Sequence, residues 1–301
     1  MRIAVFAICL ATTLSAACSV RRYAVNQIGN ALASGGSTFT SDEDLELVGG
    51  ALPFSLKLME SLLEESPRHS GLLLAASSGF TQYGYVFVEE PADENGGSLE
   101  QANIQRQRAR RLYLRACRYG MRGLERRSPG LGASLEKEPK AALARLGRRD
   151  VPLLYWTAAA YGLAISTSRN DPEMIAEIPV AEALISRALE LEEAWGEGAV
   201  HEFLISFEGA RPAGPPAEAE ARLRRHFERA LELSKGARAS VFVAYAEAAA
   251  IRFQRREEFQ SLLQKALAVN PDARPDNRLA NLVAQRRARR LLGRTDDLFL
   301  N

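Results

Sequence analysis

The chain has 301 residues, 47% of them hydrophobic, and a formal net charge of +2. That is enough apolar material for a sizeable core, and so small a net charge argues against a nucleic-acid-binding protein. Its three cysteines and three histidines form no CxxC, HExxH or Cys/His cluster, so we expect neither a metal site nor a cofactor.

The first residues have the pattern of a secretory signal. Arg2 supplies a positive charge, residues 3–14 are apolar, and small residues at 15–17 precede Cys18. The apolar stretch is too short to be a comfortable membrane span. Leu-Ser-Ala-Ala-Cys resembles a bacterial lipobox, although its leucine lies one position further from the cysteine than usual. We expect Cys18 to be lipidated; the alternative is an ordinary secreted protein in which Cys18 has no special role.

This interpretation sets the domain organisation. We predict a lipoprotein signal peptide over residues 1–17, a lipidated N-terminus and tether over residues 18–40, and one helical domain over residues 41–301. Cys9 leaves with the signal and Cys18 carries the lipid, so Cys117 remains as a buried small hydrophobe without a disulfide partner. Ser19, in place of an aspartate after Cys18, favours the outer membrane. We therefore expect a periplasm-facing protein anchored in the cell envelope.

Beyond the signal, the hydrophobic pattern is helical. Apolar residues recur at spacings of three and four, and no convincing alternation of six residues indicates a strand. Turn-forming segments rich in glycine, proline, asparagine and serine interrupt this pattern around residues 35–37, 91–98, 128–132, 169–172, 211–216 and 270–275. We predict an all-α fold of ten to twelve helices.

Four segments carry the alternation of small and large residues that is typical of the second helix of a tetratricopeptide unit. The positions that match are Ser55, Met59, Leu62, Pro67, Ala181, Ile185, Ala188, Leu189, Phe227, Ala230, Leu231, Leu263, Ala266, Leu267 and Pro271. Long insertions at residues 89–99 and 128–140 argue against a regular open superhelix. The sequence therefore predicts degenerate tetratricopeptide-like hairpins in a compact single domain.

Two segments are apolar or small on all faces, and such helices are buried in a core or against another subunit. The first, residues 71–88, carries Phe80, Tyr83, Tyr85 and Phe87; the second, residues 151–166, carries Trp156 and Tyr161. We take these six aromatic residues as candidates to line a site for a hydrophobic ligand or pore. The alternative is that both segments are core-facing first helices of repeats.

Two segments are rich in arginine. The run from Gln105 to Arg122 is the most basic, and its leucines and tyrosines at helical spacing favour a solvated helix face over an RNA site. The last helix carries Arg286, Arg287 and Arg290 opposite an apolar seam. We predict these three as partner contacts, for an acidic protein or anionic lipid; the alternative is a solvated cap.

We do not expect an enzyme. Glu64, Glu65, His69 and Ser70 lie in a predicted turn between helices, where nothing would desolvate a carboxylate or orient a nucleophile.

Several phrases resemble one known family. They are His201–Pro212, Arg224–Glu247 and Asn270–Phe299 and, more loosely, Gly50–Glu89 after the tether. On these residues the sequence is similar to the T component of tetratricopeptide-associated TRAP transporters, the TatT family of bacterial lipoproteins.

The resemblance implies a homotrimer with a largely apolar channel and a role with the solute-binding P component of a TRAP transporter, on hydrophobic or amphipathic solutes. The rival hypothesis is a tetratricopeptide lipoprotein adaptor, pilotin-like or similar to outer-membrane assembly factors, that binds a protein segment in a concave groove. A third hypothesis is a purely structural lipoprotein of the cell envelope.

Overall fold

The structure is a computed structural model that describes residues 23–94, 98–168, 170–210 and 215–300. These residues form helices and connecting turns, with no strand among them, which confirms the all-α prediction. The predicted signal peptide and Cys18 lie outside the described residues. None of the described helices has both the length and the apolar character needed to cross a membrane.

Part of the predicted tether is helical and packs on the domain. Residues 23–34 form a helix, and α2 (Gly36–Thr40) follows. Val25 and Leu32 lie against the core, and the hydroxyl of Ser66 donates a hydrogen bond of 2.8 Å to the Asn26 side-chain oxygen. This part of the predicted tether thus contacts the helical domain, and the boundary at residue 41 stays a prediction.

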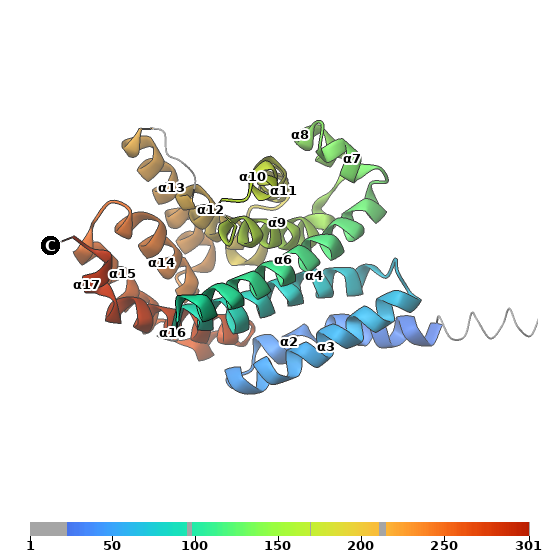
Figure 1. The fold of residues 1–301 in the computed structure, drawn as a ribbon, viewed down its shortest axis with the longest axis horizontal. Helices are drawn as coiled ribbons and strands as arrows, with labels where there is room; N and C mark the ends of the chain where they lie inside the picture. The colour runs from blue at the N-terminus through green and yellow to red at the C-terminus, as the bar shows by residue number, and fades with distance from the viewer. Residues whose placement is uncertain (1–22, 95–97, 169, 211–214, 301) are drawn as a thin grey trace, which may run out of the picture.

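Four long helices form the centre of the fold: α3 (Leu45–Glu65), α4 (Ser70–Gly84), α6 (Leu99–Arg127) and α9 (Val151–Ser166). Side chains cap three of them. The carboxylate of Asp44 accepts from two backbone N–H groups of α3, Nδ1 of His69 accepts from Leu72 N–H at the start of α4, and Ser98 caps α6. In Figure 1, α4 and α6 run side by side across the middle of the molecule.

Small residues let α4, α6 and α9 approach closely. Ala76, Ala116 and Ala160 are fully buried, one on each helix. A Cβ atom on Gly120 of α6 would lie 2.2 Å from the hydroxyl of Thr157 on α9 and 3.0 Å from that of Ser77 on α4. Only glycine fits at this crossing, because any side chain would overlap atoms of both neighbours.

Shorter elements lie between the longer helices. They are α5 (Glu90–Glu94), α7 (Leu131–Leu135), α8 (Pro139–Ala142), η2 (Leu143–Arg145), η3 (Arg148–Asp150), α10 (Pro172–Ala176) and η4 (Trp195–Glu197). The longer helices that follow are α11 (Ile178–Leu191), α12 (Ala199–Ala210), α13 (Pro216–Ser234), α14 (Ala239–Tyr245), α15 (Arg256–Ala268) and α16 (Arg278–Gly293). The chain ends with η6 (Pro271–Ala273) and η7 (Pro275–Asn277) before α16, and α17 (Thr295–Leu298) after it.

Neighbouring helices pack in sequence, α9 with α11, α12 with α13, and α14 with α15 and α16. Residues expected at close helix contacts are fully buried, namely Ala181, Ile185, Ala188, Ala230 and Ala266. The predicted small positions are thus core positions, while the tetratricopeptide assignment itself stays a prediction.

Two helices end in π-helical turns. The first, η1 (Tyr85–Glu89), continues α4, and the second, η5 (Ala246–Ile251), continues α14. Such turns carry one extra residue per turn, are rare, and redirect the side chains that follow. Tyr85 in the first turn and Glu247 in the second both accept hydrogen bonds from one arginine of α16, Arg287.

Arginines of α16 join this helix to residues in the first third of the chain. The carboxylate of Glu90, only 2% exposed, pairs with Arg287 and, at 3.0 Å, with Arg290. Arg290 also donates to the Glu90 carbonyl at 3.0 Å, and Arg286 to the Val86 carbonyl at 3.3 Å. We call this group of contacts the Glu90 clasp. It links α16 to η1 and to the start of α5.

Replacing Glu90 by glutamine tests the clasp. Glu90→Gln leaves Arg290 without its carboxylate, while Arg287 keeps Glu247, so we expect the free energy of unfolding to fall by about 3 kcal/mol. Chemical denaturation measures this loss. As a control, Glu228→Gln at an exposed position of α13 should change it by less than about 0.5 kcal/mol. Equal stabilities for the two variants would contradict the role given to Glu90.

Candidate functional site

Three of the six candidate aromatic residues form a row along α4 and η1. Phe80, Tyr83 and Phe87 are spaced at i, i+3 and i+7, the spacing of one helix face. Phe80 is buried, whereas Tyr83 and Phe87 are half-buried and their ring centroids lie 5.7 Å apart. Phe87 packs against α3, where a Cβ on Gly49 would lie 2.8 Å from its ring.

Arginines and a tyrosine of α6 cover this aromatic row. The guanidinium of Arg115 lies 5.2 Å from the Phe80 ring centre, and that of Arg108 lies 6.0 Å from the Tyr83 ring centre. Tyr119 stacks on Phe80 with a centroid distance of 5.9 Å and an interplanar angle of 12°. Apolar rings below and cationic groups above are the chemistry that holds an amphipathic molecule.

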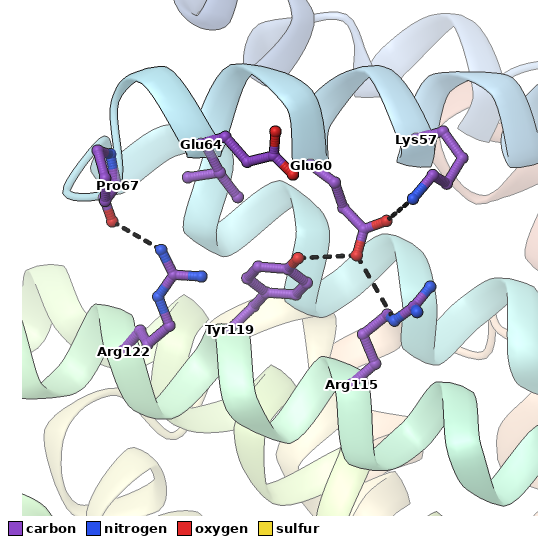
Figure 2. Close-up of a pocket in the computed structure, with 8 residues that line it drawn as sticks. Lys57, Glu60, Glu64, Pro67, Arg115, Tyr119 and Arg122 are labelled. Atoms are coloured by element: carbon purple, nitrogen blue, oxygen red, sulfur yellow. Dashed lines mark hydrogen bonds and ion pairs between the residues drawn. The ribbon is translucent and has the colours of Figure 1, made fainter.

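A cavity of about 330 Å³ lies beside Tyr119, between α3 and α6. Figure 2 shows Lys57, Glu60, Glu64 and Pro67 on one side of it and Arg115, Tyr119 and Arg122 on the other. Leu63 completes the lining. The cavity is mainly charged, so it suits a polar group better than a hydrocarbon chain.

Glu60 is the centre of polar contacts in this cavity. It accepts hydrogen bonds of 2.7 Å from both Lys57 and Tyr119, and Arg115 lies 3.5 Å away (Figure 2). Burial alone would raise the pKa of Glu60, but these donors and charges outweigh it and hold the pKa below its ordinary value. Burial and the Glu60 carboxylate raise the pKa of Tyr119 to about 12. Glu60 therefore stays ionised and Tyr119 stays protonated near neutral pH.

The other three candidate aromatic residues lie apart from the row. The hydroxyl of Tyr85 accepts a 2.7 Å hydrogen bond from Arg287, and burial raises its pKa. Tyr161 packs near Cys117 in the core, and burial raises its pKa as well. Trp156 meets Tyr155 edge-on at 5.2 Å. The structure thus brings Phe80, Tyr83 and Phe87 together in the row. Tyr85, Trp156 and Tyr161 are not part of the row, although Tyr161 packs against the same core cluster as Phe80.

A second cavity, of about 160 Å³, lies between the start of α4 and the segment around Asp150. Arginines, Asp150 and small or apolar residues line it. None of the six candidate aromatics lines either cavity. Within one described chain, the aromatic row is therefore a half-covered surface between α3 and α6.

The three arginines predicted as partner contacts are bound within the chain. Arg287 and Arg290 hold Glu90, and Arg286 donates to the Val86 carbonyl. Their side chains are only partly exposed, whereas Arg289 on the same helix is exposed. Their first role is to attach α16 to η1, and contact with another molecule stays a prediction.

Sequence reasoning missed a pair of histidines. His201 and His226, 25 residues apart on α12 and α13, face each other with their Nδ1 atoms 2.9 Å apart. Nε2 of His201 lies 3.1 Å from Glu193, which also accepts 2.8 Å and 2.7 Å hydrogen bonds from Arg229. The only sequence signal was the placement of both residues in neighbouring helices.

The charge of this histidine cluster depends on pH. Burial, and then the neighbouring His201, lower the pKa of His226 to about 4, and burial also lowers that of His201. The hydrogen bond from Arg229 lowers the pKa of Glu193 to about 2. Both rings are therefore neutral at neutral pH, since two imidazolium groups at 2.9 Å would repel each other.

The described residues also bear on the sequence expectations for metal binding, for Cys117 and for His69. No group of three histidine, cysteine or carboxylate side chains there is placed to hold a metal ion. Burial raises the pKa of Cys117, so its thiol stays protonated. His69, once considered with Glu64 and Glu65, caps α4 and lies 3.3 Å from the Asn26 carbonyl.

Comparison with known proteins agrees with the resemblance seen in the sequence. Residues 41–299 match the family described as TRAP transporter T-component. One relative, an uncharacterized protein of Treponema pallidum (strain Nichols), is 31% identical over 315 residues, which cover 98% of this chain and 96% of that protein.

The histidine pair predicts a loss of stability in acid. The unfolded chain takes up protons below the ordinary histidine pKa of 6.5, whereas His226 in the folded protein does so only near its lowered pKa of about 4. Stability should therefore be complete above pH 6.5 and fall progressively down to about pH 4. Denaturant midpoints measured across this range test it.

His226→Gln should flatten the loss between pH 6.5 and 4. The control His69→Asn keeps a side-chain acceptor at the start of α4, and it should lose stability in acid as the unmodified protein does. The same slope in His226→Gln as in the unmodified protein would show that the pair does not govern acid stability.

Proposed function

Because the chain belongs to the TRAP transporter T-component family, we propose that it is a lipid-anchored, non-catalytic accessory that binds hydrophobic or amphipathic solutes together with the solute-binding component. Proteins of this family are accessories of TRAP-type transport systems and not a known enzyme family. The lipid anchor is Cys18, and the protein faces the periplasm from the outer membrane.

The observation that carries this proposal is the aromatic row. Tyr83 and Phe87 are half-buried aromatic side chains, and Arg108 lies over Tyr83. Phe80, in the same row, stacks on Tyr119, which lines the charged cavity. An apolar ligand part can pack on the rings while its polar group meets the α6 arginines. The row is open within one chain, which fits a homotrimer in which another subunit completes the enclosure.

Native mass spectrometry of the mature protein, purified in mild detergent, tests this function. We expect the mass of three chains with bound lipid-like molecules. Tyr83→Ser/Phe87→Ser should lower the fraction carrying such molecules at least about fivefold, because a buried aromatic contact contributes on the order of 1 kcal/mol or more. Phe253→Ala, in the other half of the molecule, should leave it unchanged.

Each outcome decides one part. A ligand-free protein would overturn solute binding and favour the adaptor hypothesis, whereas unchanged binding in Tyr83→Ser/Phe87→Ser would move the site elsewhere. A ligand-bearing monomer would overturn the trimer alone.

Membrane fractionation tests the anchor. Wild-type protein should remain with the membranes after a high-salt wash and be released only by detergent, since acyl chains and not charges hold it. Cys18→Ala should lack the acyl chains and appear in the soluble fraction. Equal retention of both proteins would contradict lipidation at Cys18.

A further inference from the structure

Helix α6 concentrates positive charge. Its residues Leu99–Arg127 include nine arginines and two glutamates, a formal charge of +7, whereas the whole chain carries +2. Six of these arginines share one helix face, spaced three and four residues apart over about 27 Å. We call them the arginine row: Arg108, Arg111, Arg115, Arg118, Arg122 and Arg126. All are exposed except Arg115, whose side chain is 38% exposed.

Neutral groups hold most of the row in place. Arg122 donates a 3.0 Å hydrogen bond to the Pro67 carbonyl and lies 5.3 Å from the Tyr119 ring centre (Figure 2). Arg126 donates to the Ser70 hydroxyl, and Arg108 donates to the Tyr83 hydroxyl at 3.4 Å. Rings and neutral acceptors fix a guanidinium without cancelling its charge.

Carboxylates, by contrast, neutralise arginines elsewhere in the molecule. Arg229 pairs with Glu193 at 2.7 Å, Arg238 with Glu202 at 2.8 Å and Arg255 with Glu220 at 2.6 Å. In the row, only Arg115 has a carboxylate within 4 Å among the described residues, and that carboxylate also pairs with Lys57. Arg111 and Arg118 form no hydrogen bond or ion pair there.

Six like charges on one helix face disfavour the isolated fold, since cations three or four residues apart repel. Arg111 and Arg118 are both exposed. What compensates such a row is an acidic surface from outside.

Resting on the proposed function, we propose that the arginine row is the docking surface for an acidic face of the solute-binding component. A protein fits better than a membrane or a nucleic acid because the neighbouring cavity carries Glu60 and Glu64. These carboxylates repel a uniformly anionic partner, but they accept basic side chains of a mixed protein surface. The cavity of about 330 Å³ has room for such a side chain.

The experiment measures binding of the full mature protein to the purified solute-binding component of the same TRAP system, at low and at high salt. The test variants are Arg111→Ala/Arg118→Ala and the charge reversal Arg111→Glu/Arg118→Glu. Both residues lack intramolecular partners in the described chain, so folding should be preserved; thermal melting checks this. The matched control is Arg145→Ala/Arg289→Ala, which removes two exposed arginines that lie outside α6.

We expect affinity to fall about tenfold or more in Arg111→Ala/Arg118→Ala, and further on charge reversal, while the control binds like wild type. Wild-type affinity should also weaken at high salt, because screening reduces contacts between exposed charges. Wild-type binding that neither variant weakens would overturn the arginine row while leaving the proposed function intact.

If the wild-type protein does not bind the component, the proposed function itself is wrong. Phosphatidylglycerol vesicles and a single-stranded oligonucleotide are then tested with the same variants. If either probe binds through Arg111 and Arg118 when the component does not, the assignment of the row to a protein partner is overturned.

Discussion

The buried carboxylate of Glu90 is the constraint on which the two ends of the fold depend. It is 2% exposed and lies between Arg287 and Arg290, about 200 residues further along the chain. An ion pair removed from water is costly unless both partners are held in good geometry, so it selects one arrangement over alternatives that leave a charge alone. The π-helical turn Tyr85–Glu89 directly precedes Glu90, and its first residue, Tyr85, accepts a hydrogen bond from Arg287 as well. Phe87 lies within the same turn, and the clasp thereby sets where the aromatic row ends.

The two arginine-rich helices show why charge in a sequence does not reveal its use. In helix α16, Arg286, Arg287 and Arg290 make contacts within the chain, to carbonyl groups and to the buried carboxylate of Glu90. Helix α6 directs its arginine row outward and fixes it with neutral groups. In the sequence, both helices show a basic face opposite an apolar seam. The difference lies in which carboxylates fold against them, and that is a property of tertiary structure.

Periodicity was enough to predict the helices and much of the core. The segment Val151–Ser166 is apolar on all faces and starts with Pro152 near its first turn, and α9 has those bounds. Close-packed alanines such as Ala181 and Ala230 followed from the small-residue pattern. The Glu90 clasp and the His201–His226 pair could not be predicted, because no local pattern links residues on different helices. The spacing of three and four residues from Arg108 to Arg126 is visible in the sequence. That most of these arginines lack carboxylate partners could be seen only in the structure.

The candidate site depends both on features visible in the sequence and on the packing of the helices. Phe80, Tyr83 and Phe87 were predicted from aromatic content, whereas their common face and their cover of α6 arginines come from the packing of α4 between α3 and α6. Tyr85 lies in the same predicted segment, but it stands two residues after Tyr83 and therefore off the helix face of the row, and it contacts Arg287 of the clasp instead. An aromatic row with arginines above it is attractive both to an apolar solute and to an acidic protein face. A component that docks on the arginines would therefore stand beside the rings, and solute could pass between the two proteins without crossing open water.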